Sequence, residues 1–268
     1  MSDEIDPDID ELSEDLDILP GEPTEAPVLR VLQNTAALVN EVADRIVAAA
    51  DRSAADGQMF SLFLSGGSTP KALYERLATD DYRNQLDWRA VELYFGDERC
   101  VPPENELSNY RMAKESLIDR VPIPADNIYR MRGEIDPEAA AKEYGQMLKS
   151  RFMDDGPDVM LLGMGDDGHT ASLFPGTTAL DEAKHRCVAN HVPHDYIPKG
   201  TNWRITLTIP FINRSRDVFA LITGASKADR LSQVLEGVDA ASRALPIRRV
   251  KPTPGTLTWF LDVAAAGM

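Results

Sequence analysis

The alternation of apolar and polar residues predicts helices and strands in turn along most of the chain. Apolar residues recur at helical spacing from Leu32 to Val47, which predicts a helix over about residues 33–55. Short apolar runs predict strands at Met59–Leu64, Val91–Phe95, Val159–Leu162, Ile205–Ile209 and Val218–Thr223. Helical patterns fill the intervals at about residues 70–79, 108–119, 137–153 and 225–236. Strands that alternate with helices predict an α/β fold, in which helices cover both faces of a mostly parallel sheet.

Composition is consistent with a globular protein. The chain has 268 residues, of which 43% are apolar, enough to build a buried core. No apolar run approaches the ~20 residues of a membrane helix, and the N-terminus lacks the basic and apolar regions of a secretory signal. The two cysteines, Cys100 and Cys187, stand far apart and outside any CxxC pattern, as is typical of a reducing compartment. We therefore expect a cytoplasmic protein that does not bind a membrane.

Charge divides the chain into two parts. Residues 1–25 contain eleven acidic residues and no basic one, and removing them changes the net charge from −16 to −5. Their prolines and like charges predict a disordered acidic tail. Residues 26–268 are expected to form a single α/β domain, with an irregular stretch at 176–202 as a possible lobe. No basic stripe is present, so a nucleic-acid partner is not expected, while protein partners are left open.

A glycine loop follows the predicted strand that ends at Leu64. It consists of Ser65, Gly66, Gly67, Ser68 and Thr69. Ligands of open α/β sheets bind beyond the carboxyl ends of the strands, and glycines let the backbone approach an anion closely. The hydroxyl groups and the start of the next helix favour phosphate, although a plain turn is the alternative. The nucleotide motif GxxxxGK[ST] is absent, so nucleotide hydrolysis is not predicted.

A second polar cluster follows the strand Val91–Phe95. It contains Asp97, Glu98 and Arg99, with Ser108-Asn109 further along the chain. Carboxylates beside an arginine at a strand end are suited to holding sugar hydroxyls. A surface ion pair of little energetic consequence is the equal alternative.

A third cluster, Gly163–Ser172, combines glycines, acids and a histidine. Its Gly-x-Gly-x-x-Gly pattern formally matches a dinucleotide loop, but Asp166 and Asp167 would place negative charge beside a pyrophosphate. His169 follows the last glycine, and histidine titrates near neutral pH. We therefore predict His169 as a general acid–base catalyst whose ring is oriented by Asp167.

Three cations are candidates for neutralising a phosphate. They are Lys199, Arg204 and Lys227, the last of which follows a predicted strand. His191, His194 and Asp195 resemble a metal site only superficially, because no further ligand stands at a recognisable spacing. No metal is therefore predicted.

Taken together, these segments resemble the 6-phosphogluconolactonase family. The matching segments are SGGSTP at 65–70, DER at 97–99, GMGDDGHTASLFPG at 163–176, RITLT at 204–208 and GASK at 224–227, and the resemblance spans roughly residues 28–266. It implies a modified Rossmann-like fold shared with glucosamine-6-phosphate deaminase and ribose-5-phosphate isomerase. It also implies hydrolysis of 6-phospho-D-glucono-1,5-lactone in the oxidative pentose phosphate pathway, without a metal or organic cofactor.

Two other functions are compatible with the same resemblance. The deaminases carry a glutamate five residues after the histidine, whereas this chain has Phe174, whose apolar ring cannot transfer a proton. Non-enzymatic sugar-phosphate sensors of this fold carry an N-terminal DNA-binding helix-turn-helix. This chain has there an acidic segment that DNA would repel. Lactone hydrolysis is therefore the favoured hypothesis.

Overall fold

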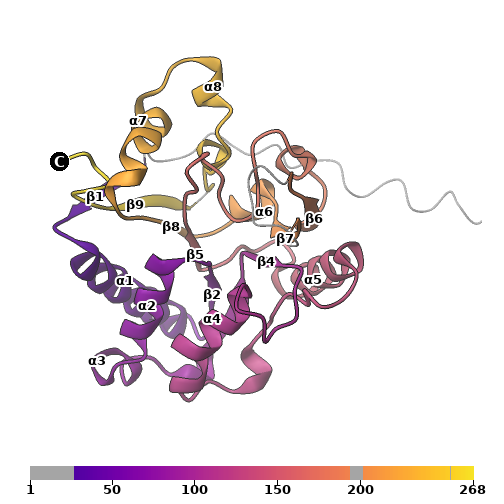
Figure 1. Ribbon diagram of the computed structural model, residues 1–268. Helices are drawn as coiled ribbons and strands as arrows, with labels where there is room; N and C mark the ends of the chain where they lie inside the picture. The colour runs from indigo at the N-terminus through magenta and orange to yellow at the C-terminus, as the bar shows by residue number, and fades with distance from the viewer. Residues whose placement is uncertain (1–26, 194–201, 254) are drawn as a thin grey trace, which may run out of the picture.

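Two β-sheets organise the computed structural model, which describes residues 27–193, 202–253 and 255–268. The larger is a parallel six-stranded sheet in the order β1-β9-β8-β5-β2-β3, and the smaller is an antiparallel three-stranded sheet in the order β4-β7-β6 (Figure 1). The strands are β1 (Val28–Leu32), β2 (Phe60–Leu64), β3 (Val91–Phe95), β4 (Asp97–Arg99), β5 (Val159–Leu162), β6 (Cys187–His191), β7 (Trp203–Leu207), β8 (Asp217–Ile222) and β9 (Thr256–Asp262). The acidic segment at residues 1–25 and the candidate cation Lys199 lie outside the described residues.

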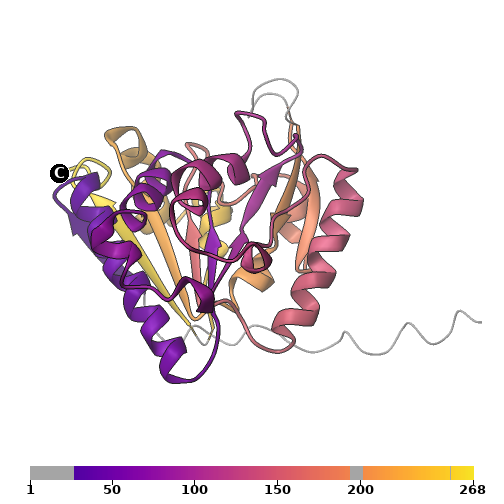
Figure 2. The ribbon, with the colours of Figure 1, turned by 90° about the horizontal axis from the view of Figure 1, so that it is seen from below.

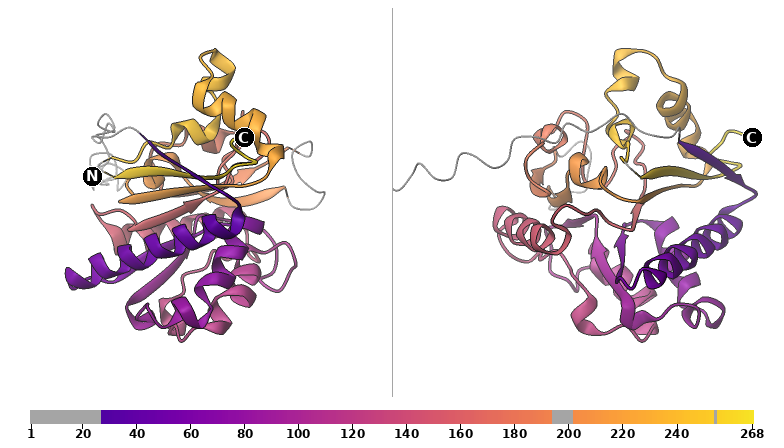
Figure 3. Two further views of the ribbon diagram at one scale, coloured as in Figure 1. Left: turned by 90° about the vertical axis from the view of Figure 1, so that its left-hand side faces the viewer. Right: turned by 180° about the vertical axis from the view of Figure 1, so that it is seen from behind.

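Helices lie on both faces of the larger sheet, as the alternating pattern predicted. They are α1 (Thr35–Ala55), α2 (Ser68–Leu77), α3 (Asp80–Arg83), α4 (Asn109–Ser116), α5 (Pro137–Phe152), α6 (Ile209–Ile212), α7 (Ala228–Glu236) and α8 (Ala240–Arg243). The edge-on view in Figure 3 places α1 and α2 on one side of the sheet and α7 and α8 on the other. Helix α5 packs on β6 and β7 of the smaller sheet, at the flank opposite α1 (Figure 2). Among the described helices, none is long and apolar enough to cross a membrane.

The longest helix, α1, shows how the apolar spacing becomes packing. The side chain of Asn34 accepts a hydrogen bond from Ala37 N at 2.9 Å and so caps the first turn. The buried residues of α1 form one stripe along the helix: Leu38, Val39, Val42, Ala43, Ile46, Ala49 and Ser53. Each large apolar side chain buried in this stripe contributes roughly 1.5–3 kcal/mol to folding. The predicted helix at 33–55 is therefore confirmed to within two residues.

The predicted strands Val91–Phe95 and Val159–Leu162 are confirmed as β3 and β5, whereas other strand predictions differ from the structure. The predicted strand Ile205–Ile209 is shifted, because β7 ends at Leu207 and Ile209 begins α6. Four strands, β1, β4, β6 and β9, were not predicted. Strand β4 has the sequence Asp-Glu-Arg and therefore shows no alternation of apolar and polar residues. Strand β1 is a mostly exposed edge strand, and its last residue, Leu32, fits the helical spacing of the apolar residues that follow. The stretch at 176–202 contributes β6 to the smaller sheet.

The order of the strands fixes where a ligand can bind. The chain moves from β2 outward to β3, and then returns to the other side of β2 with β5, so the direction of winding reverses between β2 and β5. Crevices at such a reversal, beyond the carboxyl ends of the strands, are the usual ligand sites of open α/β sheets. The glycine loop after β2 and the His169 loop after β5 therefore meet at the same edge.

Candidate active site

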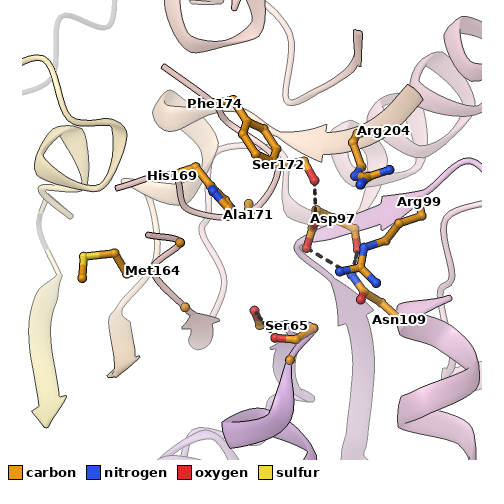
Figure 4. A pocket seen from close by; sticks show the side chains of 14 residues that line it. Ser65, Asp97, Arg99, Asn109, Met164, His169, Ala171, Ser172, Phe174 and Arg204 are labelled. Carbon is orange, nitrogen blue, oxygen red and sulfur yellow. Dashed lines mark hydrogen bonds between the residues drawn. The ribbon is translucent and has the colours of Figure 1, made fainter. Parts of the chain in front are cut away.

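A cavity of about 300 Å³ lies at this reversal point. It is lined by Ser65, Gly66, Gly67, Asp97, Arg99, Asn109, Gly163, Met164, Gly165, His169, Ala171, Ser172, Phe174 and Arg204. The lining comes from the segments that follow β2 and β5, from the first residue of α4, and from β4 and β7, which are neighbouring strands of the smaller sheet. Figure 4 shows His169 on one side of the pocket and the guanidinium groups of Arg99 and Arg204 on the opposite side.

The imidazole of His169 is held by Asp167. Asp167 Oδ1 lies 2.6 Å from His169 Nδ1 and also accepts the backbone N–H of His169 at 3.0 Å. Burial raises the pKa of Asp167, but the hydrogen bond and charge of His169 outweigh it and leave that pKa below its ordinary value. An ionised Asp167 favours the tautomer with hydrogen on Nδ1, which leaves Nε2 as a proton acceptor. This is the arrangement that general base catalysis requires.

Glycines make room for this pair. A Cβ atom on Gly165 would lie 2.1 Å from His169 Nδ1, so only glycine lets the backbone pass so close to the ring. Gly168 has a φ of +82°, a conformation that favours glycine, and it turns the chain directly before His169. The glycines of this loop therefore allow the backbone to pass close to the imidazole and to turn directly before it.

Asp97 joins three segments of the chain at the pocket wall. Its Oδ2 accepts a hydrogen bond from Ser172 Oγ at 2.6 Å, and its Oδ1 accepts one from Asn109 Nδ2 at 3.2 Å. All three residues are buried and line the cavity. Neither Asn109 nor Ser172 was predicted as a site residue. Both stand inside segments that the sequence singled out, but only the fold brings them to Asp97.

Glu98 has a structural role. Its carboxylate accepts backbone N–H groups of Arg99, Asn109 and Tyr110, each at 2.8 Å, and the hydroxyl of Ser108 at 3.0 Å. Burial raises the pKa of Glu98, and these four donors oppose that rise. Glu98 therefore anchors the first turn of α4, which carries Asn109 into the pocket.

Two arginines face the cavity from neighbouring strands. Arg99 of β4 and Arg204 of β7 are directly opposed in the antiparallel register. Burial, together with the positive charge of Arg99, lowers the pKa of Arg204 from 12.5 to about 10. Like charges at opposed positions of a sheet are destabilising on their own. A bound anion between them removes that penalty, so this wall is suited to a phosphate group.

Only some of the other candidate phosphate ligands line the cavity. Ser65, Gly66 and Gly67 line the cavity, whereas the side chain of Thr69 is hydrogen-bonded to Thr223 Oγ1 at 2.7 Å, and Ser68 is not part of the lining. Lys227 is also outside the lining and forms an ion pair with Asp166. Among the described residues, Arg99 and Arg204 are the arginine or lysine side chains that line the pocket.

No three acidic, histidine or cysteine side chains among the described residues come together as a metal site would require. Of the residues considered for such a site in the sequence, His191 instead contacts the ring of Trp203 edge-on, with 5.0 Å between ring centroids. His194 and Asp195 lie outside the described residues.

Comparison with known proteins was made on sequence and on structure. The family model described as glucosamine-6-phosphate isomerases/6-phosphogluconolactonase matches residues 33–259. A 6-phosphogluconolactonase of Nostoc sp. is 39% identical over 244 residues, which cover 88% of this chain and 96% of the relative. One of Haemophilus influenzae is 38% identical over 202 residues, covering 75% of this chain and 84% of the relative.

Solved structures are similar over nearly the whole chain. A 6-phosphogluconolactonase from Trypanosoma brucei superimposes with a TM-score of 0.79 at 30% identity, covering 90% of this chain and 98% of that one. A monomeric glucosamine-6-phosphate deaminase has a TM-score of 0.75 at 21% identity, covering 90% of this chain and 99% of that one, which indicates a shared fold. The modified Rossmann-like α/β class expected from the sequence is confirmed.

Proposed function

Because the chain belongs to the family of glucosamine-6-phosphate isomerases and 6-phosphogluconolactonases, we propose that it hydrolyses 6-phospho-D-glucono-1,5-lactone to 6-phospho-D-gluconate, the second step of the oxidative pentose phosphate pathway. This makes it a carboxylic ester hydrolase. The observation that carries the proposal is one pocket with the His169–Asp167 pair on one side and the Arg99–Arg204 pair on the other. A lactone with a remote phosphate needs a base and an anion site in the same cavity.

The substrate would be held through its phosphate. Arg99 and Arg204 are the cations within the cavity, and guanidinium groups match the geometry of phosphate oxygens. Lys199 and Lys227 remain candidates from the sequence, and Lys227 would have to leave Asp166 to take part. Ser65, Gly66 and Gly67, the part of the glycine loop that lines the cavity, would then face the substrate, with Asp97 available to the sugar hydroxyl groups. Anchoring the remote dianion places C1 of the lactone beside His169.

The chemistry uses water and one base. His169 Nε2 accepts a proton as the water oxygen bonds to C1, while the ionised Asp167 stabilises the imidazolium that forms. Backbone N–H groups of the glycine loop, of which Gly66 and Gly67 line the cavity, or a nearby cation would stabilise the negative charge on the carbonyl oxygen. The bond from C1 to the ring oxygen then breaks, and His169 returns its proton to that oxygen. No metal or organic cofactor takes part in these steps.

The related deaminase reaction is not favoured. It would need an acid–base group at the position that Phe174 occupies, and the deaminase structure shares the fold at only 21% identity. The sensor alternative leaves the His169–Asp167 pair without a purpose.

We further propose that residues 26–268 act as one catalytic domain in the cytoplasm, with no nucleic-acid or membrane partner. The two cysteines, which are both free thiols, support a reducing compartment.

The decisive experiment is a coupled assay on freshly generated lactone, corrected for spontaneous hydrolysis, with glucosamine-6-phosphate as a parallel substrate. We expect lactonase turnover in the wild type and loss of most of it in His169→Ala, about 10²- to 10⁴-fold. The variant should still bind 6-phosphogluconate. Deamination without lactonase activity, or full turnover by His169→Ala, would overturn the proposal.

A further inference from the structure

The ring of Phe174 lies flat against the imidazole of His169. Their centroids are 4.0 Å apart and their planes differ by 24°, which is a stacked arrangement. Phe174 is 3% exposed and lines the same cavity, five residues beyond His169 in the chain. At this distance the faces of the two rings are in van der Waals contact.

Three contacts together define the position of the imidazole. Asp167 Oδ1 lies 2.6 Å from Nδ1 and fixes one edge of the ring. The backbone of Gly165 passes so close that a Cβ there would meet both Nδ1 and Cε1 at 2.1 Å. The flat face of Phe174 adds a contact over the plane of the ring, which opposes tilting of the imidazole out of that plane.

Phe174 is itself held in place by the fold. The turn before it is closed by a hydrogen bond from Leu173 N to Thr170 O at 2.9 Å, and Ala171 within this turn has a φ of +46°. Thr177 then donates its N–H and its hydroxyl to the Phe174 carbonyl, at 3.3 and 2.8 Å. A positive φ is costly for alanine and persists only where surrounding contacts hold it, and these hydrogen bonds hold the backbone on both sides of the Phe174 side chain.

From this geometry we infer that Phe174 is a positioning residue for the lactonase reaction, which sets the plane of the His169 imidazole and thereby the direction of Nε2. The inference rests on the proposed function. General base catalysis depends on the alignment of the accepting nitrogen with water, and a displacement of about 1 Å costs up to about a hundredfold. The side chain takes no proton and needs only its flat face.

The test compares two substitutions at this position. Phe174→Leu keeps an apolar side chain of similar size without the flat face, and Phe174→Tyr keeps the ring. We expect the leucine variant to lose about tenfold to a hundredfold in kcat with the Kd for 6-phosphogluconate within about twofold of wild type. The tyrosine variant should recover most of that loss. Equal kcat in the leucine variant and the wild type, or equal losses in both variants, would overturn the inference.

Phe219→Leu is the matched control. Phe219 is also 3% exposed, contacts Phe260 edge-on at 5.3 Å and lies away from the cavity lining. Its variant should keep the wild-type kcat, which separates positioning from a general effect of removing a buried ring. A loss in Phe219→Leu equal to that in Phe174→Leu would overturn the inference.

A spectroscopic readout is independent of turnover. Because the two rings are stacked, we expect the ring current of Phe174 to shift the ring-proton NMR signals of His169 upfield; Phe174→Leu should move them back, and Phe219→Leu should not. Unchanged His169 signals in Phe174→Leu would overturn the inference. Absence of lactonase activity in the wild type would instead defeat the proposed function and leave this structural result intact.

Discussion

Ser172 donates a hydrogen bond from its Oγ to Asp97 Oδ2 over 2.6 Å, and both residues are buried. This bond joins the loop that carries His169 to the strand that carries Arg99, two parts of the chain that the sequence separates by 75 residues. The backbone of Ser172 is fixed as well, because its N–H donates to Thr206 Oγ1 at 3.1 Å and its carbonyl accepts from Asn190 Nδ2 at 2.8 Å. The segments that carry the proposed base and the proposed anion site are therefore joined in one hydrogen-bonded unit.

Ser172→Ala should loosen this unit. It leaves a buried carboxylate oxygen without one of its donors, at a cost of about 1–3 kcal/mol in the free energy of unfolding. Because the distance between His169 and Arg99 is then less well fixed, we expect kcat to fall as well. Thermal unfolding and the lactonase assay measure the two effects. Ser150→Ala, which removes an exposed hydroxyl bonded to Met147 O, should change neither, and wild-type behaviour of Ser172→Ala would contradict the expected coupling.

The second prediction concerns the charge of the arginine pair. Burial and the charge of Arg99 lower the pKa of Arg204 to about 10, which leaves the guanidinium charged at neutral pH. A lysine at this position starts from an ordinary pKa of about 10.4, and the same two causes push it toward neutrality. A lysine is charged below its pKa and neutral above it. Arg204→Lys should therefore lose affinity for 6-phosphogluconate as pH rises from 7 to 9, while the wild type should not.

Isothermal titration of 6-phosphogluconate across this pH range measures the difference without interference from the unstable lactone. Arg243→Lys, an exposed exchange in α8, serves as the control and should match the wild type. An affinity of Arg204→Lys that does not change with pH would place the phosphate elsewhere in the cavity.

The third prediction concerns Glu98. Each of its two oxygens accepts two hydrogen bonds, so the NH₂ group of a glutamine must face a pair of donors. We expect Glu98→Gln to lower the free energy of unfolding by about 2 kcal/mol or more, although it removes a desolvated charge. Glu115→Gln within α4 breaks an exposed ion pair with Arg111, worth about 0.3–0.5 kcal/mol. Urea unfolding measures the free energy of unfolding of both variants. If Glu98→Gln loses no more stability than Glu115→Gln, Glu98 does not anchor α4.

These relationships show what the sequence could and could not predict. His169 and Asp167 are two residues apart in a glycine-rich loop, so their pairing follows from local geometry and was predictable. The opposition of Arg99 and Arg204 depends on the pairing of β4 with β7, and a three-residue strand of charged residues carries no apolar pattern from which to infer it. The stack of Phe174 on His169 depends on the turn at Ala171, where a positive φ at a residue other than glycine has no sequence signature.

The last prediction concerns Gly66, which follows β2 and lies against Asn109, one of the residues hydrogen-bonded to Asp97. A Cβ atom there would lie 2.2 Å from Asn109 Oδ1, and Asn109 is buried and bonded to Asp97 through Nδ2. Gly66→Ala should therefore displace the Asn109 side chain, break its bonds to Asp97 and lower both kcat and stability. Removing the obstructing group relieves the clash, so Asn109→Ala should make Gly66→Ala cost less than it does alone.

The coupling is measured by a double-mutant cycle on the free energy of unfolding, in which Gly66→Ala and Asn109→Ala are expected to be non-additive by about 1 kcal/mol or more. Gly145→Ala is the matched control. A Cβ on Gly145, within α5, meets Cys187 only at an ordinary 3.7 Å. Since alanine is favoured over glycine inside a helix, this variant should be stabilised by about 0.5–1 kcal/mol with unchanged kcat. Additive losses at Gly66 and Asn109 would mean that the glycine is required by the substrate or the backbone, and not by the contact with Asn109.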